Sequence, residues 1–182
     1  MDYKVTLNGK EYGLPIVEIK EGLSIAVLDM LSSLKLSQDA SAAVYKKLQE
    51  SGLDLSKIDT VLSAETKGIT LAYQMAEYLN CDMVILRKEQ KIYHKAVTKG
   101  VVNTYTTKNQ HYLYLDNNQI PKLKDKNVLI VDDVVSTGSS LAAIEQILNQ
   151  VGANIYAKAF VFAEGDAAKR DDVIFVDALP LL

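Results

Sequence analysis

Short apolar runs alternate along the chain with stretches whose apolar residues recur every three or four positions. The runs predict buried strands at residues 60–64, 83–86, 128–131, 155–162 and 173–176. The periodic stretches predict amphipathic helices at 69–79 and 141–151, each lying between two of the runs. Strands and helices that alternate in this way form a parallel sheet covered by helices, so we predict an α/β fold.

The first fifty residues carry a different pattern. Asn8-Gly9 separates two strand-like stretches, 5–7 and 11–19, and predicts a β-hairpin. Pro15 restricts the second arm to a sheet edge, because proline has no N–H to donate. Helical spacing predicts helices at 23–31 and about 38–50, with Gly52 as the stop of the second. We therefore predict one domain, residues 1–182, with an N-terminal appendage of about 1–35 and a core at 60–176.

Residues 88–110 are the least regular part of the chain, with few large apolar side chains and many Lys, Thr and Asn. Segments of this length inside a compact domain are usually mobile functional loops or extended hairpins. We expect this segment to act as a lid. A strand-like alternation follows at 112–115, and Pro121 ends the excursion.

Composition narrows the class of protein. The 182 residues are 48% hydrophobic and 24% charged, as in globular proteins, and no window approaches the ~20 apolar residues of a membrane span. The start, Met-Asp-Tyr-Lys-Val, lacks the pattern of a secretory signal, so we expect a cytoplasmic protein with no membrane partner. A net charge of −3 argues against nucleic acid as the main partner. The single cysteine, Cys81, is expected to be a small buried residue.

Residues 127–140 carry the strongest chemical signal. An apolar strand at 128–131 ends in Asp132 and Asp133, which cannot both be core residues and so predict an open, polar edge. A small-residue turn follows, Ser136-Thr137-Gly138-Ser139-Ser140, and then a helix begins. Free backbone N–H groups and the positive end of a helix dipole make such a turn a binding site for an anion.

Two further polar segments follow strands and are predicted to lie at the same edge. The turn Glu65-Thr66-Lys67-Gly68 follows strand 60–64, and Arg87, Lys88 and Lys91 follow strand 83–86. Together these groups suit a ligand with two separate phosphate groups and a polyhydroxyl centre, since carboxylates accept hydrogen bonds from sugar hydroxyls and cations bind pyrophosphate. Mg²⁺ normally accompanies pyrophosphate, held mainly by substrate oxygens and water, and we assign it no direct protein ligand.

The run 128–140 resembles the phosphoribosyl pyrophosphate signature of type I phosphoribosyltransferases, and about residues 60–165 are most similar to adenine phosphoribosyltransferases. The resemblance implies a parallel Rossmann-like sheet flanked by helices, an N-terminal hood over the site, and a flexible β-loop at 92–110. It implies that Asp132 and Asp133 contact the ribose, and that Val134, Val135 and the turn 136–140 surround its 5′-phosphate. The turn 65–68, Arg87, Lys88 and Lys91 would contact pyrophosphate, and Tyr105 matches the catalytic loop tyrosine.

The resemblance implies transfer of 5-phosphoribosyl from its pyrophosphate to a purine, with Mg²⁺ as cofactor, in a homodimer that serves purine salvage. The chain departs from the adenine pattern at Lys67, where arginine is usual, at Ser139, where glycine is commoner, and after Tyr105, where no acidic residue follows. Adenine is favoured, while xanthine, hypoxanthine or another base remains an alternative. A non-catalytic regulator that senses phosphoribosyl pyrophosphate is a second alternative. The base is expected near Leu14, Ile16, Phe162 and Glu164, and His94, the only histidine expected near the site, is assigned no role.

Overall fold

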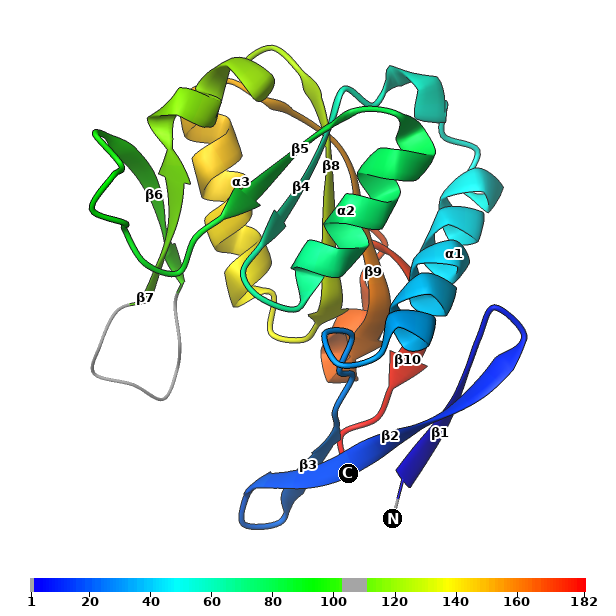
Figure 1. The fold of residues 1–182 in the computed structure, drawn as a ribbon. Helices are drawn as coiled ribbons and strands as arrows, with labels where there is room; N and C mark the ends of the chain where they lie inside the picture. Colours follow the sequence, from blue (N-terminus) through cyan, green and yellow to red (C-terminus); the bar gives the residue numbers. More distant parts are fainter. Residues whose placement is uncertain (1, 103–110) are drawn as a thin grey trace.

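A five-stranded parallel sheet forms the centre of the molecule. The computed structural model describes residues 2–102 and 111–182. The strands stand in the order β10-β9-β8-β4-β5 and comprise β4 (Thr60–Ala64), β5 (Asp82–Leu86), β8 (Asn127–Val135), β9 (Asn154–Glu164) and β10 (Ile174–Leu179). Helices α1 (Leu34–Glu50) and α2 (Gly68–Leu79) cover one face, and α3 (Ser139–Val151) covers the other (Figure 1). The predicted α/β fold is confirmed.

Alternate residues of the central strands serve two separate hydrophobic clusters. Val61 and Leu129 pack with α1 and α2, whereas Leu62 and Val128 pack with α3. All four are fully buried. Burial on both faces explains why these strands are continuous apolar runs in the sequence.

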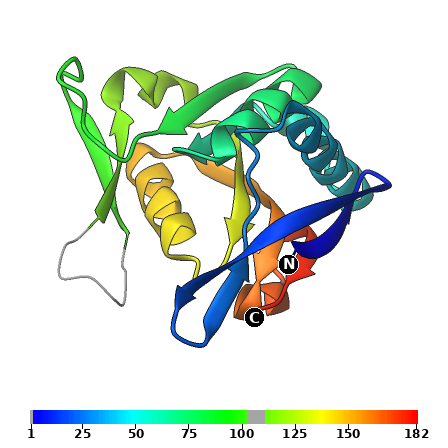
Figure 2. The ribbon, with the colours of Figure 1, turned by 60° about the horizontal axis from the view of Figure 1, so that its bottom comes forward.

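The N-terminal segment forms a small antiparallel sheet, which we call the hood. It comprises β1 (Asp2–Leu7), β2 (Lys10–Lys20) and β3 (Leu23–Ala26), in the order β1-β2-β3. Figure 2 shows it crossing in front of the carboxyl edge of the central sheet. The hairpin at Asn8-Gly9 is confirmed, with both residues at positive φ.

Two predictions for the hood were wrong. Pro15 does not mark a sheet edge, because β2 is the middle strand. Pro15 is tolerated there because it pairs with Asp2 at the very end of the β1–β2 ladder. Its carbonyl still accepts a hydrogen bond from the Val27 N–H at 2.9 Å. Residues 23–31 form β3 and an irregular segment instead of a helix. β3 pairs with β2, and on its other side the Ser24 N–H donates to the Leu182 carbonyl at 2.7 Å. Helical spacing could not reveal a partner so distant in the sequence.

Asp39 of α1 fastens the hood to the core. Its carboxylate accepts hydrogen bonds from Asn8 Nδ2 at 2.9 Å, from Lys10 Nζ at 2.8 Å and from the Tyr12 hydroxyl. Asp39 is only 5% exposed, so these three hood residues replace the water it would otherwise bind. The hydrogen bonds from Lys10, Tyr12 and Asn8 hold the pKa of Asp39 well below its usual range, and the bond to Asp39 raises the pKa of Tyr12 to about 12.

A second antiparallel pair, β6 (Val97–Val102) and β7 (His111–Asp116), packs against α3. Gly100 permits this contact, because a β-carbon there would lie 2.2 Å from the Ala143 carbonyl oxygen of α3. The extended-hairpin alternative for 88–110 is thus confirmed for the described residues. Residues 103–110 of the predicted lid, including Tyr105, lie outside the described residues. Short 3-10 helices lie at Leu55–Lys57, Asn117–Lys122 and Gly165–Lys169.

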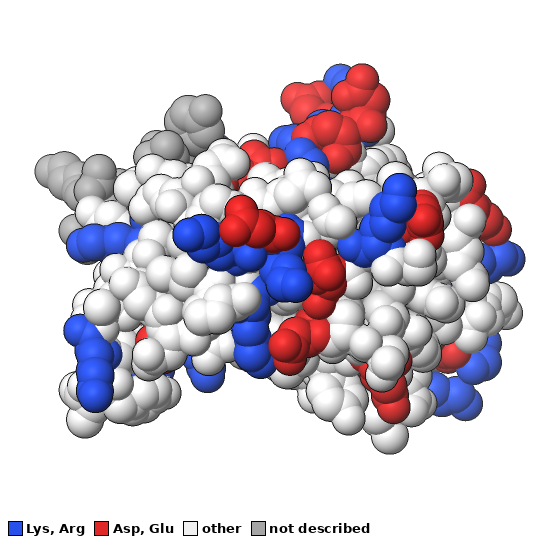
Figure 3. Space-filling view, turned by 90° about the horizontal axis from the view of Figure 1, so that it is seen from above, with Lys and Arg blue, Asp and Glu red and all other residues white. Residues whose placement is uncertain are grey.

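The face opposite the hood carries charges of both signs, interspersed instead of gathered in one basic patch (Figure 3). A broad basic field is the usual basis of binding to a nucleic-acid backbone, and this face does not provide one. Within the described part of the chain, no helix combines the length and the apolar character needed to cross a membrane.

Candidate active site

The candidate site lies where the direction of strand addition reverses. From β4 the chain adds β5 on one side of the sheet, and from β8 it adds β9 and β10 on the other. Pairing between β4 and β8 ends at Leu62 and Ile130, whereas β8 stays paired with β9 as far as Val135. A crevice therefore opens beside the last part of β8, and in open α/β sheets ligands bind at such a point.

Asp132 and Asp133 lie within β8, although the sequence analysis ended the strand before them. Pairing with β9 continues past them because β9, with 11 residues, is longer than β8, with 9, and Asp132 lies opposite Phe160. The expectation of an open edge still holds on the β4 side, where β4 has already turned away. The carboxylates thus extend from a rigid strand into the crevice.

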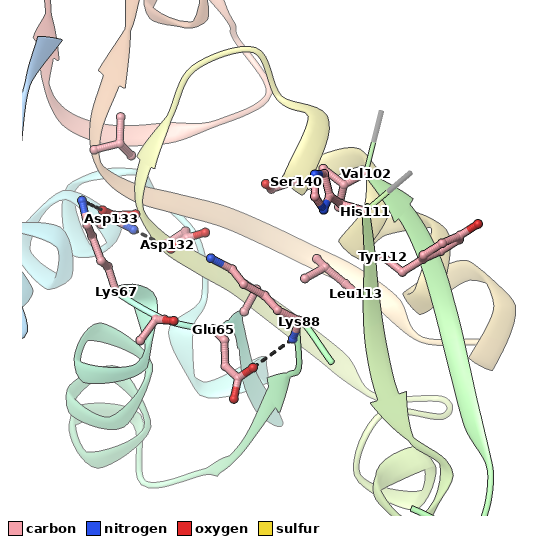
Figure 4. A pocket seen from close by; sticks show the side chains of 13 residues that line it. Glu65, Lys67, Lys88, Val102, His111, Tyr112, Leu113, Asp132, Asp133 and Ser140 are labelled. Carbon is pink, nitrogen blue, oxygen red and sulfur yellow. Dashed lines mark hydrogen bonds and ion pairs between the residues drawn. The ribbon is translucent and has the colours of Figure 1, made fainter. Parts of the chain in front are cut away.

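A cavity of about 530 Å³ occupies this crevice (Figure 4). Its polar lining comes from three predicted segments: the turn after β4, the residue after Arg87, and the end of β8 with the start of α3. The predicted residues that line it are Glu65, Thr66, Lys67, Lys88, Asp132, Asp133, Val134 and Ser140. The fold therefore brings together side chains separated by up to 75 positions in the sequence.

The acid pair is electrostatically strained. Burial raises the pKa of Asp132 well above its usual range, and the neighbouring charge of Asp133 raises it further. Lys67 Nζ lies 3.6 Å from Asp133 Oδ2 and is the cation that pairs with Asp133. The two carboxylates lie close together, and of the two only Asp133 has an ion-pair partner among the described residues. The pair therefore favours a ligand that donates hydrogen bonds or carries positive charge.

The turn after β8 encloses a second, smaller cavity of about 60 Å³. Residues 135–140 line it, together with Asp132, Val134 and three apolar residues of α3 and β9. Gly138 adopts φ 77° and ψ 4°, a left-handed conformation that turns the chain into the first residues of α3. The Thr137 and Ser139 hydroxyls lie 3.1 Å apart at its rim. The volume is several times the ~10–15 Å³ that one water needs, which suits a small polyatomic anion.

The turn after β4 is held by a charged anchor. Arg87 Nη1 donates to Glu65 Oε1 at 2.6 Å, and the Lys88 N–H donates to Glu65 Oε2 at 2.9 Å. Burial pushes the pKa of Glu65 upward, but these two donors outweigh it and the net pKa is lowered. The peptide bond between Glu65 and Thr66 is cis. Glu65 thus joins β5 to the turn and leaves the Lys88 side chain directed into the cavity (Figure 4).

Gly68 begins α2 directly beneath the acid pair. A β-carbon at this position would lie 2.1 Å from Ser63 Oγ and 2.5 Å from Asp132 Oδ1. The predicted Arg87 and Lys91 do not line the large cavity. Arg87 lines a different one with Tyr93 and His94, and Lys91 pairs with Glu89 at 3.3 Å.

The wall opposite the acids was not predicted from the sequence. The β6–β7 hairpin supplies it through Val102, His111, Tyr112 and Leu113. Figure 4 shows His111 beside Val102 and facing Ser140, while Tyr112 points away. His94 was wrongly taken as the histidine near the site: it is 8% exposed and its Nδ1 accepts from the Lys91 N–H at 3.3 Å, outside the cavity. The alternation at 112–115 predicted a strand, but only its pairing with 97–102 brings His111 to the site.

Two of the four residues predicted to contact the base are core residues. Leu14 and Phe162 are 1% and 0% exposed and belong to the cluster beneath α1 and α2. Their side chains therefore face the interior instead of the crevice, because the period of two along a strand turns alternate residues inward. Ile16 and Glu164 are half-buried and line neither cavity. Cys81 is also half-buried, packed against the same cluster as a free thiol.

The donor set of the crevice fits a hard cation that arrives with a phosphate ligand. In the described ranges, no three His, Cys, Asp or Glu side chains are grouped to hold a metal ion alone. Asp132 and Asp133 nevertheless present carboxylate oxygens, which Mg²⁺ prefers, and a dication would relieve their mutual repulsion. Such an ion would need further oxygen ligands from the substrate and water.

An acid pair at the switch point, a small anion-sized cavity and a larger cationic cavity are the parts expected of a site for a phosphorylated sugar. The family model described as the phosphoribosyl transferase domain matches residues 28–179. The chain belongs to this family. Its similarity to adenine phosphoribosyltransferases confirms the resemblance to the type I phosphoribosyltransferases.

Relatives within the phosphoribosyltransferase family differ in their names. A hypoxanthine/guanine phosphoribosyltransferase of Methanotorris igneus is 29% identical over 90% of this chain and 80% of its own. The purine biosynthesis transcriptional repressor of Bacillus subtilis is 34% identical over 54% of this chain and 34% of its own. The crystal structure of Saccharomyces cerevisiae adenine phosphoribosyltransferase, complexed with an imino-altritol bisphosphate and adenine, superposes with a TM-score of 0.73 at 25% identity, covering 90% and 93% of the two chains.

Proposed function

We propose that this chain transfers a 5-phosphoribosyl group from phosphoribosyl pyrophosphate to a purine base, releasing pyrophosphate. The observation that carries the proposal is the Asp132–Asp133 pair in the crevice of the sheet, with a small cavity on one side and a larger one containing Lys67 and Lys88 on the other. This arrangement matches a ribose that carries a phosphate at one end and a pyrophosphate at the other. The yeast relative is complexed with a bisphosphate and adenine, which supports a ligand of this class.

Each group of residues then has one part of the substrate to bind. The ribose hydroxyls donate to Asp132 and Asp133, because an ionised carboxylate only accepts hydrogen bonds. The 5′-phosphate lies in the turn 136–140, where backbone N–H groups and the α3 dipole stabilise it. Pyrophosphate lies against Thr66, Lys67 and Lys88, with Gly68 below and Glu65 held by Arg87. Lys91, which follows Lys88 in the segment after β5, stays a proposed contact of the pyrophosphate.

Departure of pyrophosphate leaves positive charge on the ribose, so the work of the site is electrostatic. Lys67 and Lys88 stabilise the leaving group, while the carboxylates of Asp132 and Asp133 lie close to the developing positive charge. Mg²⁺, when bound with the substrate, neutralises pyrophosphate charge. The β6–β7 hairpin forms a wall that limits the access of water, and Tyr105 is proposed to cover the reacting centre from the segment that follows β6.

Adenine is the base we favour, on the strength of the yeast relative and its bound adenine. The Methanotorris relative keeps hypoxanthine and guanine as alternatives. Ile16 and Glu164 remain the proposed base contacts, since both are half-buried, Ile16 on hood strand β2 and Glu164 at the carboxyl end of β9. We further propose that residues 1–182 act as a single domain in a cytoplasmic homodimer. Light scattering of the purified chain tests whether it is a dimer.

The decisive experiment incubates the protein with phosphoribosyl pyrophosphate, Mg²⁺ and each of adenine, hypoxanthine, guanine, xanthine, uracil and orotate. We expect adenosine monophosphate and pyrophosphate, with activity lost on chelation of the metal. A product with another purine instead of adenine would reassign the base, and no nucleotide from any base would refute the enzyme proposal.

Replacing Asp132 by Asn tests the ribose assignment. Burial and the charge of Asp133 raise the pKa of Asp132 in the folded chain. The free energy of unfolding therefore falls as the pH rises toward neutrality and Asp132 ionises. The Asp132→Asn variant should therefore unfold at higher temperature at pH 7 and yet bind phosphoribosyl pyrophosphate at least about tenfold more weakly. Asp166→Asn is the matched control, because that carboxylate is 94% exposed on the 3-10 helix after β9. Unchanged affinity in Asp132→Asn would contradict the assignment.

A second candidate function is a non-catalytic sensor of phosphoribosyl pyrophosphate. The match to the Bacillus repressor supports it, although that match spans only about half of this chain and a third of the repressor. Calorimetric binding of phosphoribosyl pyrophosphate without turnover of any base would favour the sensor over the enzyme.

A further inference from the structure

An arginine from the segment after β9, Arg170, lies beside the turn 136–140. Arg170 follows the 3-10 helix Gly165–Lys169, and its N–H donates to the Ala167 carbonyl at 3.1 Å. Its Nη1 lies 2.9 Å from where a β-carbon of Gly138 would be. Gly138 is the left-handed residue at the centre of the turn, so the guanidinium occupies the space that a side chain at position 138 would fill.

The guanidinium is held in place from its far side. Arg170 Nε donates to Asp172 Oδ1 at 2.8 Å, and Nη2 donates to Asp172 Oδ2 at 2.7 Å. Asp172 also accepts from Lys158 Nζ at 2.5 Å, and Lys158 donates in turn to Glu145 of α3 at 2.8 Å. The two-point contact fixes the plane of the guanidinium and leaves Nη1 without a hydrogen-bond partner among the described residues. It is this unpaired end that faces Gly138.

The turn itself offers a phosphate little positive charge. It contributes backbone N–H groups, hydroxyls and the α3 dipole, but Asp132 also lines the same small cavity. Lys67 pairs with Asp133 and Arg87 pairs with Glu65, both at the other end of the site. Arg170 does not line the small cavity and lies behind the turn, so it would act on a bound phosphate through the turn, as a fixed charge and a support.

We propose that Arg170 is a positioning residue for a phosphomonoester bound at residues 136–140. Its charge stabilises the bound phosphate, and its fixed plane supports Gly138 in the left-handed conformation that shapes the turn. The ligand class is a sugar 5-phosphate; the proposal rests on the proposed function for the identity of the turn as a phosphate site. It predicts that Arg170 matters for the 5′-phosphate and not for the pyrophosphate, which binds at the opposite end.

Titration calorimetry of the full chain with ribose 5-phosphate and, separately, with pyrophosphate and Mg²⁺ tests this. Arg170→Gln should weaken ribose 5-phosphate binding about fivefold to tenfold and leave pyrophosphate binding unchanged. Arg170→Lys should recover part of the loss at low salt, because it restores the charge without the two-point contact. Lys169→Gln is the matched control: it removes the same charge one residue earlier, from a side chain that is 81% exposed and pairs with Asp166.

Arg170 would have no such role if Arg170→Gln bound ribose 5-phosphate as the unaltered chain does. An equal loss for both ligands, with no recovery in Arg170→Lys, would also overturn the proposal, since it would indicate a general structural role. These outcomes are separable from those of the proposed function, because neither titration requires turnover. A chain that binds ribose 5-phosphate with help from Arg170 but makes no nucleotide would support this inference and refute the enzyme.

Discussion

Gly68→Ala tests whether the position of Asp132 is set by the helix beneath it. The added β-carbon would lie 2.1 Å from Ser63 Oγ and 2.5 Å from Asp132 Oδ1, closer than van der Waals contact allows. Both atoms are ends of side chains, so they can move aside. Asp132 must then leave the position from which it is proposed to bind the ribose.

The expected change in stability is small because two effects oppose each other. Overpacking a tight site costs about 1–3 kcal/mol, with the low end applying where side-chain ends can shift. Replacing glycine by alanine within a helix contributes up to about 1 kcal/mol in return. The free energy of unfolding should therefore fall by no more than about 1–2 kcal/mol, while affinity for phosphoribosyl pyrophosphate falls about tenfold or more.

A double variant separates the two contacts. The Ser63 hydroxyl is fully buried and has no hydrogen-bond partner in the described structure, so Ser63→Ala alone should be neutral or stabilising. Ser63→Ala/Gly68→Ala removes the 2.1 Å contact and keeps the one with Asp132. Urea unfolding should show stability recovered in the double variant, and calorimetry should show affinity still low. Affinity that returns together with stability would refute the reasoning, since it would trace the whole effect to Ser63.

Two more predictions concern the elements that frame the site. Asp39→Asn should detach the hood from α1 and weaken the loss of stability at acid pH. The pKa of Asp39 is depressed in the folded chain, so its contribution to the free energy of unfolding is present above about pH 4 and is lost as the pH falls further. Urea unfolding from pH 2 to 7 measures this, and an unchanged pH dependence below about pH 4 would count against the anchor. Gly100→Ala should place a β-carbon 2.2 Å from the Ala143 carbonyl, a backbone atom that cannot move aside, and cost about 1–3 kcal/mol. Activity should fall together with stability, since the hairpin carries His111. Thr98→Ala, on the same strand, is the control for a change without overpacking. Equal losses of stability in Gly100→Ala and Thr98→Ala would contradict the close approach.

The sequence by itself determined the α/β class and most of the strands and helices of the core. The side chains of a strand point to both faces of its sheet, so a continuous apolar run is buried only where both faces are covered. The helical patterns between the runs leave little choice of topology. It also located the acid pair and the small-residue turn, because those residues are adjacent in the chain. The order of a strand, two carboxylates, a small-residue turn and a helix is local. It is sufficient to predict an anion site without any long-range contact.

Only the tertiary structure decided what faces that stretch. Pairing of β3 with β2, together with the Ser24–Leu182 hydrogen bonds, makes a strand of a helical pattern. Burial makes Leu14 and Phe162, which were predicted to contact the base, part of the core. The β6–β7 pairing brings His111 to the cavity, and Asp172 aims Arg170 at Gly138. Each of these depends on a partner distant in the sequence or on which face of a strand is covered. Local periodicity carries neither kind of information, because the free energy that selects the partner comes from packing across the fold.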